Sequence, residues 1–155
     1  MEFAPNYDLT LLLALGFRTM IDDLHKHLAT LGYDDVRPAH GFAFQRLTPY
    51  GATGNELAAF LDITKQAASE MVDYLEQHGY VMRQPHPTDR RGKIVILTDR
   101  GWSCIWETEA ILSLLEAQWE AVIGAKRMEE LRTDLRQLVT VANGGMLPRK
   151  FRPTW

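Results

Sequence analysis

The segment Asp89–Gly101, with the sequence DRRGKIVILTDRG, constrains the fold of this chain more than any other. It begins with a short basic turn, continues through an apolar run typical of a β-strand, and reaches Thr98, which is suited to cap a helix. A helix–turn–helix pattern spans Thr53–Gly79 just before it. Two short helices followed by a basic hairpin predict a winged helix, an arrangement suited to holding duplex DNA.

Hydrophobic periodicity predicts further helices on both sides of this segment. The expected elements are a helix at 7–31, a helix from Pro38 to a break at 48–51, helices starting at Thr53 and at Thr64, the latter ending at Gly79, strands at 81–83 and 93–97, a helix from Thr98 to Gly124, and a sixth helix through 128–139 that ends near 143–145. Thr53 and Glu56 have the spacing of a capping box, and Leu57, Ala58 and Leu61 follow as inward residues.

The fold class expected from this order is mainly α with a small β-hairpin wing. A winged helix-turn-helix DNA-binding domain at 36–98 is flanked by dimerisation helices at 1–35 and 99–145, and a flexible tail follows at 146–155. The flanking helices have too much apolar surface for isolated helices, and a second copy of the same chain is the simplest partner. In the tail, Phe151 and Trp155 are candidates for docking on a partner.

Composition limits the class of protein. A chain of 155 residues suits one domain with a dimerisation extension, and its single cysteine, Cys104, excludes an intrachain disulfide. Neither an apolar run long enough to span a membrane nor a secretory signal is recognisable in the sequence. We expect a cytoplasmic protein without a membrane partner.

The net charge of −3 argues against a nucleic-acid-binding chain, but the charges are unevenly distributed. Residues 1–80 hold eleven carboxylates and five basic side chains, whereas 81–101 hold five basic side chains and two carboxylates. Attraction to phosphate decays over about 8–10 Å in physiological salt, so a local basic cluster acts despite distant carboxylates.

A helical wheel for 64–79 separates a core face from an exposed face. Ala68, Met71, Val72 and Leu75 face inward, and Lys65, Gln66, Ser69, Glu70 and Asp73 lie opposite. A glutamine can form two hydrogen bonds with adenine, and a lysine can bind guanine or a phosphate. The alternative for this face is simple solvation, which the repulsion of Glu70 and Asp73 from phosphates favours.

The turn of the hairpin carries the sharper signal for DNA. Gly92 permits a tight turn, and Arg90 and Arg91 project from its tip with Lys93 close behind. Guanidinium groups suit phosphates and the narrow minor groove, and Asp89 is placed to hold the Arg91 guanidinium. The alternative is a hairpin that is charged only for solubility.

Asp89-x-Arg91, the alternating strand and Leu97–Thr98-x-x-Gly101 resemble the wing of the MarR family of bacterial regulators. The stretches 63–69 and 75–81 resemble that family's recognition helix and its exit. The resemblance covers nearly the whole chain, with its specific part at 53–101. It implies a dimer that binds pseudo-palindromic operators and usually represses transcription, with Arg91 in the minor groove, steadied by Asp89.

The same resemblance places Thr64, Lys65, Gln66 and Ser69 in the major groove. It also implies that a small aromatic ligand in a crevice beside the dimerisation helices releases the DNA. No motif assigns this crevice; the aromatic candidates are Phe17, His40, Phe44 and Trp106, each of which also suits an ordinary core. Two departures from the family are Tyr74, where many members have an arginine, and a less basic recognition helix.

Other functions have less support. A winged helix that binds a protein in place of DNA is the alternative, although it leaves the paired arginines unexplained. No Gly-rich phosphate loop or supported nucleophile–base pair is found in the sequence, so no enzyme and no cofactor are expected. His25, His27, His78 and His86 lack metal-ligand spacing, so no metal is expected either, and Cys104 is expected to be inert packing and not an oxidant sensor.

Overall fold

The computed structural model of the chain describes residues 8–150 and contains a winged helix with long helices beside it. Its elements are α1 (Leu9–Thr30), α2 (Pro38–Leu47), α3 (Gly54–Leu61), α4 (Lys65–Gln77), β1 (Val81–Pro85), β2 (Lys93–Leu97), α5 (Asp99–Ile123) and α6 (Ala125–Ala142). The predicted fold class, mainly helical with a small β-hairpin wing, is confirmed.

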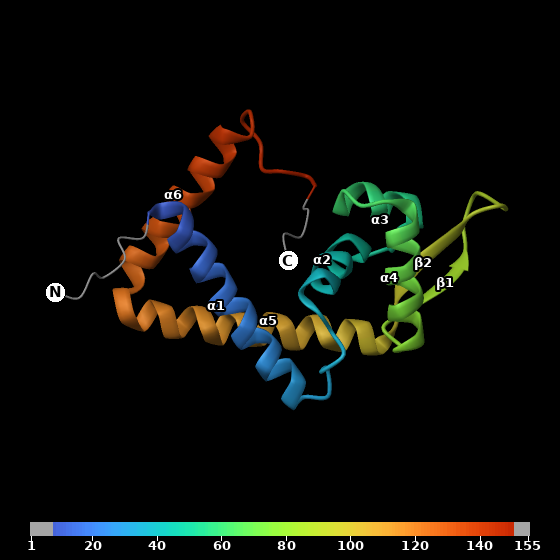
Figure 1. Cartoon of the computed structure of the whole chain (residues 1–155), viewed down its shortest axis with the longest axis horizontal. Coiled ribbons are helices and arrows are strands. Elements are labelled where there is room, and N and C mark those ends of the chain that lie inside the picture. Colours follow the sequence, from blue (N-terminus) through green and yellow to red (C-terminus); the bar gives the residue numbers. More distant parts are fainter. Residues whose placement is uncertain (1–7, 151–155) are drawn as a thin grey trace.

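The molecule is elongated along α5 (Figure 1). The helices α3 and α4 and the β-hairpin lie at one end, and α6 and the N-terminal half of α1 lie at the other (Figure 1). The helix α5 connects the two ends, and α1 crosses it and packs against it. The winged helix is therefore continuous with the long helices α1, α5 and α6, which we call the frame, and does not form a separate lobe.

Side-chain caps fix where the helices of the winged helix begin. Thr53 Oγ1 accepts from the backbone N–H of Glu56 at 3.1 Å, and the Glu56 carboxylate accepts from the N–H of Thr53 at 3.0 Å, so the predicted capping box is confirmed. The hydroxyls of Thr64 and Thr98 each accept from the backbone N–H three residues on and so cap α4 and α5. The sequence therefore predicted these three helix starts correctly.

The wing is an antiparallel pair in which Val81 faces Leu97 and Pro85 faces Lys93. The first strand is two residues longer than predicted. A third segment joins the sheet, because Ala52 exchanges backbone hydrogen bonds of 3.0 and 2.8 Å with Val95. Gly51 permits this approach: its φ is +85°, and a Cβ there would lie 2.4 Å from the Val95 carbonyl oxygen.

One continuous core runs from the winged helix to the crossing of α1 and α5. Of the predicted inward residues of α3 and α4, Met71 is half-buried and the others are buried, namely Leu57, Ala58, Leu61, Ala68, Val72 and Leu75. Leu24 and Leu28 of α1 and Cys104 and Ile111 of α5 extend this core along the frame. Gly101 brings α5 against the hairpin, since a Cβ there would lie 2.3 Å from the Tyr80 carbonyl oxygen.

The other end of the frame exposes much apolar surface. We call it the outer apolar face and define it by Leu9, Leu12 and Leu13 of α1, Leu114, Trp119 and Val122 of α5, and Leu131, Leu138, Val139 and Val141 of α6, which are 38–83 % exposed. Within residues 8–150 no helix is long and apolar enough to cross a membrane. Of the predicted flexible tail, residues 151–155, with Phe151 and Trp155, lie outside the described residues.

Candidate nucleic-acid interface

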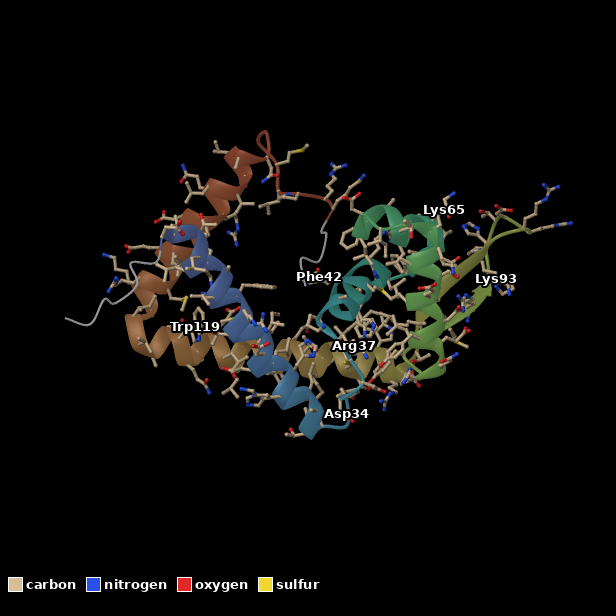
Figure 2. All side chains as sticks on the ribbon, in the orientation of Figure 1. Asp34, Arg37, Phe42, Lys65, Lys93 and Trp119 are labelled. Carbon is tan, nitrogen blue, oxygen red and sulfur yellow. The ribbon has the colours of Figure 1, made fainter. Side chains whose placement is uncertain are left out.

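The first two turns of α4 present the polar face that the wheel predicts. Lys65, Gln66 and Ser69 are exposed, and Ala68 and Val72 are buried on the opposite side. Lys65 lies at the end of α4 next to α3 (Figure 2). The Thr64 hydroxyl accepts from the backbone N–H of Ala67 at 3.1 Å, so it already caps this helix.

The carboxylates of α4 have defined partners. The Gln66 amide nitrogen donates to Glu70 at 3.0 Å. Arg83 of β1 contacts Asp73 at 2.7 Å and Glu76 at 2.9 Å. The guanidinium therefore offsets part of the charge of the two carboxylates, which reduces the repulsion from phosphates that the sequence indicates for Asp73.

Arg83 and Arg100 were counted in the basic cluster at 81–101, but both are engaged within the protein. Arg100 donates to the Tyr80 hydroxyl at 2.9 Å and to the Gly32 carbonyl oxygen at 3.3 Å, and its guanidinium lies over the Tyr80 ring. Its partners are up to 68 residues away in the chain, and local charge counting does not find such pairs. Arg90, Arg91 and Lys93 are the cations of this cluster for which the described structure shows no ion pair.

The tip of the wing is organised by two side chains. Asp89 accepts from the backbone N–H of Arg91 at 3.0 Å, and His86 Nδ1 accepts from the N–H of Asp89 at 3.1 Å and of Thr88 at 3.2 Å. We expected Asp89 to hold the Arg91 guanidinium; the contact is instead to its backbone. Gly92 does not have the positive φ that a tight turn often needs. Arg90 and Arg91 are exposed, and Lys93, which faces Pro85, lies at the end of β2 next to the tip (Figure 2).

Tyr74 stands where many members of the MarR family have an arginine, and it supports the loop between α1 and α2. Its hydroxyl donates to the Asp35 carbonyl oxygen at 2.7 Å, and its ring stacks between His40, at 5.0 Å, and His78, at 4.0 Å. The hydroxyl of Tyr80 donates to the Asp35 carboxylate. Burial and this acceptor raise the pKa of Tyr80. Asp35 therefore links the loop between α1 and α2 to Tyr74 of α4 and to Tyr80, which follows that helix.

A pocket of about 470 Å³ lies between α1, α2 and α5. Most of its lining is apolar, and three of its polar lining residues are exposed, namely Gln45, Thr48 and Glu109. His25 also lines it, and burial lowers the pKa of its imidazole. No lysine or arginine is among the described lining residues.

The four aromatic ligand candidates are not brought together. Phe44 lines the pocket, whereas Trp106 is 61 % exposed beside Trp102 on α5. Phe17 lies on α1 away from the pocket lining. His40 is buried, and its Nδ1 accepts from the Arg37 N–H at the start of α2. Sequence reasoning missed His25 and Glu109, because no motif marks a pocket built from three separate helices.

Cys104 also lines this pocket and is buried. Burial raises the pKa of its thiol to about 11, so the thiolate is scarce near neutral pH. The described part of the chain has no group of three or more His, Cys, Asp or Glu side chains that could hold a metal.

Comparison with known proteins agrees with this geometry. Residues 45–92, from the end of α2 through α3, α4, β1 and the wing tip, match the sequence model of the MarR family. Among solved structures, the reduced form of MarR from E. coli is 23 % identical with a TM-score of 0.72, over 86 % of this chain and 97 % of that one.

Two similar structures contain DNA. A mutant of MepR from S. aureus, bound to an oligodeoxyribonucleotide, is 19 % identical with a TM-score of 0.62, over 88 % of this chain and 99 % of that one. The transcriptional repressor CouR, bound to a 23-mer duplex, is 23 % identical with a TM-score of 0.68, over 85 % and 92 %. These comparisons confirm the resemblance to the MarR family, and the fold is the one that these solved regulators have.

Proposed function

We propose that this chain, which has the winged-helix fold of the MarR family, binds duplex DNA as a homodimer and represses transcription from a pseudo-palindromic operator. The observation that carries the proposal is the wing. Arg90 and Arg91 extend at its tip without an ion pair in residues 8–150, while the other arginines of the hairpin region are bound to carboxylates or carbonyl groups. Exposed guanidinium groups held on a shaped turn are suited to phosphates and the minor groove.

The proposed DNA contacts divide into two groups. Thr64, Lys65, Gln66 and Ser69, on the first turns of α4, would enter the major groove. Asp89, Arg90, Arg91 and Lys93 form the wing contact, in which Asp89 shapes the turn and the cations meet the backbone or minor groove. The DNA-bound MepR and CouR structures, which have the same fold, support this arrangement.

The outer apolar face supports the homodimer. It lies at the end of α5 opposite the wing, where a second copy would leave both wings accessible (Figure 1). Its exposed leucines, valines and tryptophan would be removed from water by an isologous contact. Two recognition helices about 34–36 Å apart then meet successive major grooves.

The pocket between α1, α2 and α5 supports an effector site. The loop between α1 and α2 contributes Val36 to the pocket wall, and the neighbouring Asp35 accepts from Tyr74 of α4. A ligand that moves this loop would therefore displace the proposed recognition helix. Because the lining carries Glu109 and no cation, we propose a small aromatic effector that is uncharged or cationic.

The test is DNA binding by the full chain at several salt concentrations, with DNA from upstream of its own gene and a scrambled duplex. Arg91→Ala is expected to weaken binding and to lower the slope of log K against log salt by about one, since one phosphate contact is lost. Lys26→Ala removes another exposed cation, which lies on α1 beside Asp23, and is the control, which should bind like the wild type.

Two outcomes would contradict the proposal. If Arg91→Ala and Lys26→Ala bind alike, the wing makes no DNA contact. If the wild type binds neither duplex even at low salt, a winged helix that binds another protein becomes the better explanation. Selective binding that weakens steeply with salt would establish the DNA-binding function.

A further inference from the structure

Gln66 and Glu70 lie one turn apart on the exposed face of α4, and a hydrogen bond joins them. The Gln66 amide nitrogen donates to a Glu70 carboxylate oxygen at 3.0 Å. An ionised carboxylate only accepts hydrogen bonds, so the NH₂ end of the amide must face Glu70. The hydrogen bond thus directs the amide nitrogen of Gln66 toward Glu70 and its carbonyl oxygen away. In an isolated exposed glutamine both orientations of the amide are open.

We propose that Glu70 is a positioning residue that holds Gln66 in the orientation that binds adenine, and so sets the base preference of α4 without touching a base. The inference rests on the proposed function, since it concerns how the same helix discriminates among sequences. It also gives Glu70 a role other than that of a solvated carboxylate.

The hydrogen-bonding groups match adenine. In the major groove adenine presents the N6 amino donor and the N7 acceptor. With one N–H engaged by Glu70, Gln66 retains its carbonyl oxygen and one N–H, which complement these two groups. Guanine presents two acceptors, O6 and N7, so the fixed carbonyl oxygen would face O6 without a donor between them.

The charge distribution on α4 supports the same inference. Of the three carboxylates on this helix, Asp73 and Glu76 are paired with Arg83. Glu70 has no ion pair within the described chain, and its side chain accepts a hydrogen bond from Gln66. An uncompensated carboxylate near the DNA weakens binding to every sequence, whereas a fixed amide favours only adenine, so Glu70 lowers general affinity and raises discrimination.

The experiment selects binding sites with the full chain from random duplexes of about two helical turns, the span of two half-sites. The selected site and its single-base variants are then titrated with the wild type, Glu70→Gln and Asp73→Asn. Asp73→Asn removes the same charge one turn further along α4 without touching Gln66, so it is the matched control. Gln66→Ala and the double variant Gln66→Ala/Glu70→Gln complete a double-mutant cycle.

The wild type is expected to prefer adenine over guanine at one position of each half-site by about fivefold or more, as for one bidentate contact. Both Glu70→Gln and Asp73→Asn should bind random DNA more tightly. Only Glu70→Gln should bring the adenine-to-guanine ratio close to one, because a glutamine at 70 can also donate and lets the Gln66 amide rotate. In the Gln66→Ala background the Glu70 change should leave the ratio unaltered.

Three results would overturn the inference. If Glu70→Gln keeps the wild-type ratio while Gln66→Ala loses it, Gln66 binds the base without help from Glu70. If the wild type selects a site but Gln66→Ala changes the preference at no position, α4 does not use this pair. If the wild type selects no duplex at all, the proposed DNA binding fails and the inference fails with it.

Discussion

His40 shows at the scale of one residue how burial shapes pH dependence. Burial and, to a smaller extent, the nearby Arg37 guanidinium lower the pKa of its imidazole to about 4. In the unfolded chain the His40 imidazole has an ordinary pKa near 6.5. It therefore takes up a proton there at a pH at which the same imidazole stays neutral in the folded chain. This contribution to stability is complete above pH 6.5 and is lost as the pH falls toward 4.

We therefore expect acid to destabilise the wild type through His40. Between pH 7.5 and 5 the free energy of unfolding should fall by about 2 kcal/mol more in the wild type than in His40→Gln, since each pKa unit corresponds to about 1.4 kcal/mol. Urea unfolding at the two pH values measures the difference. His27→Gln, on the exposed side of α1, is the control and should keep the wild-type fall; an equal fall in His40→Gln would refute the assignment.

Individual residues also show which contacts a sequence predicts. Thr53, Thr64 and Thr98 cap helices as predicted because a cap and its partner N–H lie three residues apart. Arg100 was counted in the basic cluster at 81–101, yet its partner Asp35 is 65 residues away. A pattern within one segment carries no signal for such a contact, which depends on how the loop after α1 packs against the start of α5.

At the scale of elements, Arg83 joins the wing to the proposed recognition helix. Arg83→Met would leave Asp73 and Glu76 uncompensated on the face that we propose meets DNA. We expect DNA binding to weaken by about fivefold, since two unit charges about 4 Å apart in water interact by about 1 kcal/mol. Stability should change by less than about 1 kcal/mol, as for most exposed ion pairs.

The salt dependence distinguishes this effect from a lost phosphate contact. Because Arg83 contacts carboxylates, the slope of log K against log salt should stay the same in Arg83→Met. Adding Asp73→Asn and Glu76→Gln should restore the affinity, and anisotropy titrations measure both quantities. A slope that falls by about one in Arg83→Met would mean that Arg83 itself binds a phosphate.

The elements themselves could be predicted well, and their contacts less so. Apolar periodicity and the glycines at 79 and 124 located α4 and the end of α5 because both signals are local. The bridge between Ala52 and Val95 was missed, since a single pair of residues has no strand pattern. The residues that we propose contact DNA were predicted on exposed positions, and they are exposed. The pocket forms only where three helices meet, so no single segment of the sequence indicates it.

At the scale of the whole molecule, the pocket and the proposed DNA-binding surface lie on the same frame. We expect naphthylmethanol and naphthylmethylamine to raise the melting temperature of the protein and naphthoate to leave it unchanged, because the lining has a carboxylate and no cation. Glu109→Gln should weaken the effect of the amine and keep that of the alcohol. Equal stabilisation by naphthoate would show that charge does not select the ligand.

The outer apolar face makes the assembly itself testable. Val122 is 83 % exposed and Leu138 is 60 % exposed. Val122→Glu or Leu138→Glu would place a charge in the proposed interface, where its desolvation is costly, so light scattering should give the mass of one chain in place of two. The circular dichroism spectrum should stay helical, since neither side chain belongs to the core.

Tyr50→Glu is the matched control, because Tyr50 is 86 % exposed but lies between α2 and α3, away from this face. It should remain a dimer. The monomeric variants should also lose selective DNA binding, since one recognition helix reaches only one half-site and the two half-sites no longer bind as a unit. Variants that stay dimeric would place the interface elsewhere, and monomers that bind the full site like the wild type would show that DNA binding does not need the dimer.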